Sequence, residues 1–175
     1  MSKEKNTTIS VKGVEIAIIK ENTFDYISLT DMVKSFGDDT IIYSWLRNRN
    51  TVEFLGIWEQ LNNPDFKPHE FVRFKNEAGL NRFNLSAKKW IEATGAIGLI
   101  SKSGRYGGGT YAHKDIAFEF GSWLSAEFKL YLIKEFQRLK EEESSRHSGG
   151  RLRSGGEIIL IKLVTSGMLQ PWNSW

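Results

Sequence analysis

The chain lacks cysteine altogether and contains only three histidines and three prolines among its 175 residues. The absence of cysteine excludes disulfides and thiolate metal sites, and it is compatible with a reducing compartment. His69, His113 and His147 lie far apart and show no i, i+4 or H-E-x-x-H spacing, so we expect no metal site. No apolar signal-peptide core follows the start, and no apolar run approaches the ~20 residues of a membrane span. We therefore expect a cytoplasmic protein without a membrane partner.

Motifs of common catalytic and nucleotide-binding sites are also missing. No G-x-S-x-G elbow presents a serine nucleophile, no Walker A loop occurs, and no G-x-G-x-x-G run opens a helix. Carboxylate pairs for acid–base chemistry stay open, but no feature of the sequence points to one. We expect no enzymatic activity and no small-molecule cofactor.

The net charge of +3 is unevenly distributed along the chain. Residues 1–143 contain 20 Lys and Arg and 20 Asp and Glu, so the basic pI comes from residues 144–175. Any case for nucleic-acid binding therefore rests on where charges gather. Two windows contain no acid: Thr40–Val52, with Arg47 and Arg49, and Ala93–Lys114, with Lys102, Arg105 and Lys114. These windows indicate either one-faced anion binding or chance clustering on a solvated surface.

Hydrophobic patterning predicts a strand pair and a short helix near the start. Val14–Ile18 alternates apolar and polar residues, and Phe24–Ile27 is its expected hairpin partner. Ser28 is a typical N-cap for an amphipathic helix over Leu29–Phe36, which Gly37 would end.

A second helix is predicted over Asp39–Asn50, with Asp38 or Asp39 as its cap. Its apolar stripe leaves an outer face of Tyr43, Ser44, Arg47 and Asn48. The sequence leaves open whether a further helix begins at Thr51 or the two run on as one. The pair is typical of a helix-turn-helix, although most such helix pairs are only packing units.

The middle of the chain is predicted to be less regular. Asn62–Asn81 contains two prolines and a glycine and is expected to be a loop, and Arg82–Leu85 is expected to be a short strand. Ser86 would then cap a helix over Ala87–Thr94, with Gly95 as its stop.

A glycine-rich run follows and is the most unusual stretch of the sequence. Its four glycines are Gly104, Gly107, Gly108 and Gly109, too many for the interior of a helix or strand. Flanking strands over Ile97–Ile100 and Thr110–Ala112 predict a hairpin whose tip is basic because of Lys102 and Arg105.

Two helices are predicted after this hairpin, the first capped by Asp115 and the second starting near Ser125. The composition then changes to a flexible basic linker, and residues 157–164 form one isolated apolar run. This run must pair with the domain edge, pair between chains or stay disordered. We divide the chain into a domain over 1–143 and a tail over 144–175. The sequence leaves open whether the tail belongs to the natural protein.

Four motifs occur in a specific order: YISLTD at Tyr26–Asp31, WLR at Trp45–Arg47, GRYGGGTYAHKDIA at Gly104–Ala117 and WLSAEF at Trp123–Phe128. In this order they resemble the KilA-N domain of phages, bacteria and large DNA viruses, a family related to the fungal APSES DNA-binding domains. The resemblance covers about Val14–Lys140. It departs from many members at Ala126, where they carry a proline.

This resemblance implies an α+β, winged-helix-like fold with an N-terminal β-hairpin, a helix-turn-helix, a glycine-rich β-hairpin wing and C-terminal helices. Carried over by position, the DNA-binding residues are Tyr43, Ser44, Arg47, Asn48 and Arg49 on the recognition helix and Lys102, Ser103, Arg105 and Tyr106 on the wing. The backbone of Gly104, Gly107, Gly108 and Gly109 would approach phosphates.

The implied function is binding of double-stranded DNA by a regulator of the phage, prophage or mobile-element type, associated with the nucleoid when bound. Four or five phosphate contacts would bind weakly, so a homodimer or a second protein module is the expected partner. Two alternatives stay open. The domain has kept its fold without DNA binding and serves protein interaction, or it is an accessory domain of a nuclease or toxin system.

Overall fold

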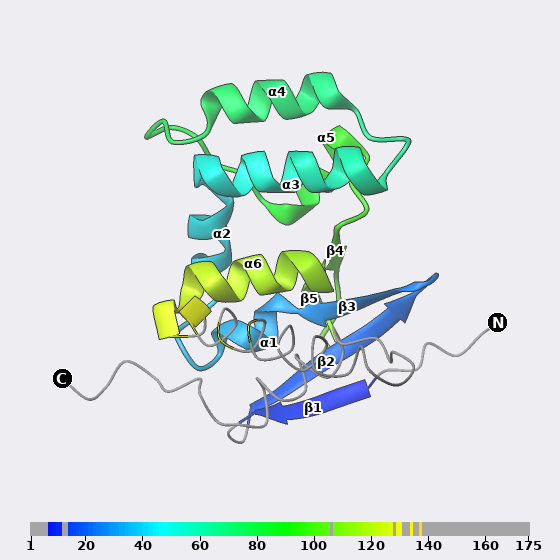
Figure 1. The fold of residues 1–175 in the computed structure, drawn as a ribbon, viewed down its shortest axis with the longest axis vertical. Coiled ribbons are helices and arrows are strands. Elements are labelled where there is room, and N and C mark those ends of the chain that lie inside the picture. The colour runs from blue at the N-terminus through cyan, green and yellow to red at the C-terminus, as the bar shows by residue number, and fades with distance from the viewer. Residues whose placement is uncertain are drawn as a thin grey trace.

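The computed structural model describes residues 7–11, 14–105 and 107–127, together with 129, 130, 134 and 137. Its strands and helices are grouped rather than alternating along the chain, in an α+β arrangement (Figure 1). In chain order they are β1 Thr7–Val11, β2 Val14–Glu21, β3 Phe24–Ser28, α1 Leu29–Val33, α2 Thr40–Leu46, α3 Arg49–Asn62, α4 Pro68–Glu77, α5 Ala87–Thr94, β4 Leu99–Lys102, β5 Gly109–His113 and α6 Lys114–Leu124. None of these helices is both long enough and apolar enough to cross a membrane.

The strands form one antiparallel sheet in the order β1-β2-β3-β5-β4. β3 pairs with β5, which places Tyr26 opposite His113. The N-terminal hairpin and the glycine-rich hairpin, both predicted, are therefore adjoining parts of the same sheet. β1 was not predicted, because its five residues contain only two apolar ones, Ile9 and Val11.

The helices enclose a hydrophobic core together with the sheet. Figure 1 shows α4, α3 and α6 in successive layers, with the strands beyond α6. The largest fully buried side chains are Trp45 on α2, Trp90 on α5, Phe74 on α4 and Phe120 on α6. The Trp45 ring contacts the Phe120 ring and the Trp90 ring contacts the Phe74 ring, which fixes α2 against α6 and α5 against α4.

Two predictions for the middle of the chain were wrong. The expected loop over Asn62–Asn81 contains the helix α4, because Pro68 stands in its first turn, where a missing N–H costs nothing. Phe71 and Phe74 point from this helix into the core. The expected strand at Arg82–Leu85 is irregular and pairs with no strand in the described part of the chain.

The helix-turn-helix occurs, but its helices are shorter than predicted. α1 ends at Val33, whose carbonyl accepts from the N–H groups of Phe36 and Gly37 at 2.8 and 2.9 Å. α2 ends at Leu46, and α3 is a separate helix that begins after Asn48 rather than at Thr51. The alternative of one continuous helix is therefore wrong.

The caps predicted at Ser28, Ser86 and Gly95 are confirmed. α6 starts two residues earlier than expected, because the N-cap is His113 and not Asp115. Most of the second helix expected after Ser125, and the whole tail over 144–175, lie outside the described residues.

Candidate nucleic-acid interface

The buried side of α2 sets the orientation of its exposed side. Ile42, Trp45 and Leu46 are buried, and Trp45 donates from Nε1 to Oε2 of Glu119 on α6 at 2.8 Å. Burial raises the pKa of Glu119, although this hydrogen bond opposes the rise. The Trp45 ring also meets the Phe120 ring edge-on at 5.0 Å. α2 is thus fixed against α6, with its other face toward solvent.

The five residues predicted for the recognition helix have different structural roles. Tyr43 and Ser44 are exposed on α2, and the Ser44 hydroxyl donates to its own helix at the Thr40 carbonyl. Arg47 caps the C-terminus of α2 and donates from one guanidinium nitrogen to the Asn81 carbonyl at 3.2 Å.

Asn48 and Arg49 belong to the junction between α2 and α3. The Asn48 side chain caps α3 by accepting from the N–H of Asn50 at 3.1 Å. Arg49 is the first residue of α3 and is exposed. The amide oxygen of Asn48 is thus already used within the fold, whereas Tyr43, Ser44 and Arg47 share the outer face of α2.

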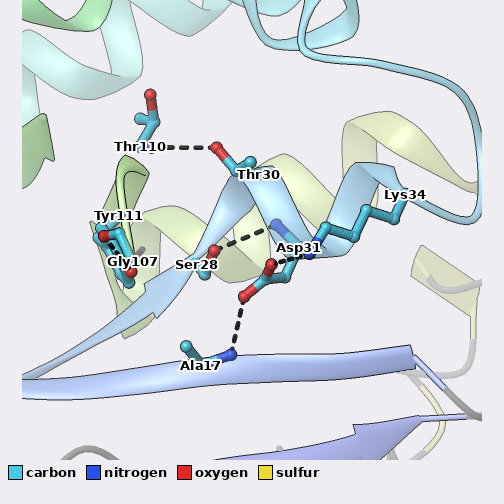
Figure 2. A network of polar contacts seen from close by, with 8 residues as sticks. All are labelled: Ala17, Ser28, Thr30, Asp31, Lys34, Gly107, Thr110 and Tyr111. Carbon is cyan, nitrogen blue, oxygen red and sulfur yellow. Dashed lines mark hydrogen bonds and ion pairs between the residues drawn. The ribbon is translucent and has the colours of Figure 1, made fainter. Parts of the chain in front are cut away.

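The glycine-rich hairpin is seated on α1, the first helix of the helix-turn-helix (Figure 2). The hydroxyl oxygen of Thr30 accepts from the N–H of Thr110 at 3.0 Å. A Cβ at Gly109 would lie 2.8 Å from the same oxygen, and φ at Gly109 is +147°. This position therefore requires glycine for both close approach and backbone conformation.

α1 is in turn attached to β2 through Asp31 (Figure 2). Its carboxylate accepts from the N–H of Ala17 at 3.0 Å and from Lys34 Nζ at 2.6 Å. Burial alone would raise the pKa of Asp31, but the hydrogen bonds from Lys34, Ala17 and Ser28 hold it below its usual value. Sheet, α1 and hairpin are thus linked in one polar network.

The tip of the hairpin is compact at its base and polar at its exposed end. A Cβ at Gly108 would meet the Gly104 carbonyl at 2.3 Å, so the two glycines permit a tight turn. Tyr111 donates its hydroxyl to the Gly107 carbonyl at 3.0 Å. Ser103 and Arg105 are exposed, whereas Tyr106 lies outside the described residues. Lys102 lies with Nζ 6.0 Å from the centre of the Tyr111 ring.

Residues of both acid-free windows, Thr40–Val52 and Ala93–Lys114, line one groove. A groove of about 300 Å³ has Tyr43 and Asp39 of the α2 region on one wall and Lys102 and Thr110 of the hairpin on another. The N-terminal end of α5 completes it through Ser86, Ala87 and Lys88. Tyr43 and Lys102, 59 positions apart, thus face the same space.

A second groove, of about 440 Å³, lies on the other side of Tyr43. Its walls are the outer face of α2 and the segment that precedes α5; its lining residues are Thr40, Tyr43, Ser44, Arg47, Asn81, Arg82, Phe83 and Asn84. None of these residues is acidic. Tyr43 therefore stands between two grooves whose polar groups, apart from the Asp39 carboxylate in the first, are mainly hydroxyls, amides and cations, the groups that contact phosphates and base edges.

A buried carboxylate behind the hairpin fixes the point where β4 begins. Glu59 of α3 is fully buried and accepts from the N–H of Gly98 at 2.6 Å and of Ile97 at 3.0 Å. The Asn63 amide donates to it at 2.9 Å. Burial raises the pKa of Glu59 against the effect of these donors.

A family model for the KilA-N domain matches residues 9–142. The chain belongs to the KilA-N family. This confirms the resemblance drawn from the four sequence motifs. No curated protein and no solved structure matches the chain. KilA-N domains are DNA-binding rather than catalytic modules, which supports a general role in DNA binding.

Two cations of this KilA-N domain were missed from the sequence. Arg82 fell within the expected strand and Lys88 within the expected helix Ala87–Thr94, yet each lines one of the grooves beside Tyr43. In the sequence they lie on either side of the Ser86 cap, and this position does not indicate that they lie near α2.

Replacing Thr30 by valine is expected to loosen the hairpin from α1. Thr30→Val keeps the shape but removes the oxygen that accepts from Thr110, so about 1 kcal/mol of unfolding free energy should be lost. Urea denaturation measures it. Thr30→Ser keeps the hydroxyl and should stay close to the parent. Equal stability of the two variants would contradict the role given to this hydrogen bond.

Proposed function

We propose that this KilA-N domain binds double-stranded DNA as a winged helix, with α2 in the major groove and the β4–β5 hairpin as a wing on the phosphate backbone. The observation that carries the proposal is the position of Tyr43 between two grooves, one of which joins α2 to Lys102. One continuous surface is thus available to one duplex.

The proposal gives the residues distinct tasks. Tyr43, Ser44 and Arg47 face bases or the adjacent phosphates from α2, and Arg49 adds charge at the start of α3. Lys102, Ser103 and Arg105 contact phosphates from the wing, as does Tyr106 by analogy with the family. The glycines Gly104, Gly107, Gly108 and Gly109 keep the wing backbone accessible to phosphate oxygens.

The biological role that we propose is regulation in a phage or mobile-element setting, on the chromosome or on incoming DNA. The KilA-N family occurs in phages, bacteria and large DNA viruses, and this distribution supports the proposed role. Four or five phosphate contacts give a weak complex at cellular salt, so we propose that a homodimer or a second protein module adds affinity.

A protein-interaction role is the second candidate, and the charge balance favours it. Residues 1–143 have equal numbers of cations and acids, so the domain as a whole has no excess positive charge to attract DNA. The two candidates differ in their salt dependence, since an interaction module without DNA contacts has none.

A salt titration with duplex DNA distinguishes them. We expect log K to fall with log[salt] with a slope of about −4, from four or five phosphate contacts at about −0.9 each. Fluorescence anisotropy with a random 20-base-pair duplex measures it. The full chain should also be measured with Arg146, Arg151 and Arg153 changed to glutamine, which removes most of the tail's charge. If the chain with these three glutamines shows no salt-dependent binding to DNA, the result favours the protein-interaction role.

A further inference from the structure

The segment Asn81–Lys88 runs along the exposed face of α2. Its first half forms the far wall of the groove that contains Arg47, and its second half contributes to the groove that contains Lys102. The hydrogen bond from Arg47 to the Asn81 carbonyl, 3.2 Å long, ties the segment to α2. The segment thus borders both sides of the surface proposed for DNA.

The backbone of this segment is held by alternating burial. Phe83 and Leu85 are 4% and 0% exposed. Arg82, which precedes Phe83, and Asn84, which lies between the two, are exposed. The Phe83 ring meets Phe74 of α4 with 6.5 Å between the ring centres. Two apolar anchors therefore turn the intervening side chains outward on a fixed backbone.

The second half of the segment is held by a helix cap. Ser86 accepts at its hydroxyl from the N–H of Lys89 at 3.1 Å and opens α5, which brings Lys88 into the first turn. Lys88 approaches Glu92 at 3.8 Å, but both side chains are more than half exposed, so this ion pair contributes little. The ammonium is therefore available to a phosphate.

Charge favours an anionic ligand on both sides of Tyr43. The cations lining the two grooves are Arg47, Arg82, Lys88 and Lys102, and Asp39 is the one acid among the lining residues. Arg47 has five N–H donors and uses one of its nitrogens for the Asn81 carbonyl, so it can also bind a phosphate. The regularly spaced phosphates of a DNA backbone fit cations that are placed on both sides of Tyr43.

We infer that Asn81–Lys88 is a third DNA-contacting element of this domain, whose Arg82 and Lys88 bind phosphates on either side of the bases that Tyr43 faces. The inference rests on the proposed function. It adds to the helix and the wing a contact that neither the sequence motifs nor the family model assigns.

The test is a double variant, Arg82→Gln with Lys88→Gln, in the full chain. Loss of two phosphate contacts should lower the salt slope by about 2. With a slope of about −0.9 per phosphate contact, each contact contributes about five- to sixfold to the affinity at 0.15 M salt relative to 1 M. Loss of both contacts should therefore weaken binding about 30-fold. Salt titration of anisotropy with a 20-base-pair duplex measures both quantities.

A matched control removes the same charge elsewhere. Arg73 and Lys89 both lie over the Phe74 ring, at 5.0 and 5.8 Å from its centre, and line neither groove. Arg73→Gln with Lys89→Gln should therefore change affinity no more than about twofold and leave the slope nearly unchanged. Thermal unfolding should show both double variants folded, because all four side chains are exposed.

The possible results separate this inference from the proposed function. If the parent binds and Arg105→Gln weakens it while the Arg82/Lys88 variant behaves like its control, the third element is refuted and the wing stands. If the parent does not bind duplex DNA at low salt, both fail. A loss confined to the Arg82/Lys88 variant would support the third element and count against the wing.

Discussion

Arg47→Glu combined with Arg105→Glu is expected to lower affinity for duplex DNA by about a hundredfold or more. Two phosphate contacts are lost, which alone accounts for about 30-fold at 0.15 M salt, and two acids then repel the backbone. Arg47 lies on the α2 side of one groove and Arg105 at the exposed tip of the hairpin. Anisotropy at several salt concentrations should also show a slope lowered by about 2 or more.

A control with the same charge change is Lys67→Glu with Lys89→Glu. Both lysines are exposed, and neither lines the grooves beside Tyr43. This control should lose far less affinity, since only the overall charge changes. Undiminished binding by the Arg47/Arg105 variant, with its fold intact by circular dichroism, would place the DNA site elsewhere on the molecule.

Glu59→Ala is expected to be the most destabilising of the substitutions considered. It leaves the N–H groups of Ile97 and Gly98 without their side-chain acceptor, and it removes one of the two acceptors of the Asn63 amide, whose other partner is the Gly95 carbonyl. Each unsatisfied buried donor costs about 1–3 kcal/mol, so we expect a loss of about 3 kcal/mol or more. Chemical denaturation followed by tryptophan fluorescence measures the unfolding free energy.

Glu59→Gln is the matched variant, since it keeps one oxygen acceptor and removes the charge. It should lose less stability than Glu59→Ala. Because burial raises the pKa of Glu59, the native state binds its proton more tightly than the unfolded state does. The parent should therefore gain stability relative to Glu59→Gln as pH falls from neutral toward the ordinary value of 4.5. Equal stability of the alanine variant and the parent would refute the anchoring role.

Features set by neighbouring residues were predictable from the sequence. Ser28 and Ser86 cap helices because a hydroxyl reaches the N–H three residues on, and Gly95 ends α5 with φ at 69°. The two hairpins followed from alternation and from glycine content. The four motifs then identified the family, and with it the region of the interface.

Local signals with two possible meanings, and contacts between distant residues, were not predictable in this way. Pro68 was interpreted as a loop signal although it begins α4, because proline serves both roles. Asn48 was placed on the recognition face, since a side chain that caps the next helix has the same composition as one that contacts DNA. The proximity of Arg82 to α2 and of Glu59 to Gly98 arises only from packing.

The pairing of β3 with β5 sets the order in which the domain is completed. Tyr26 and His113 face each other across the sheet, and Thr30 meets Thr110 across 80 positions of the chain. During synthesis, β3 must therefore wait with an unpaired edge until residue 113 has left the ribosome. The groove that contains Lys102 is lined by residues of the late strands β4 and β5, whereas the groove that contains Arg47 is not, so the surface proposed for DNA is complete only after these strands have been made.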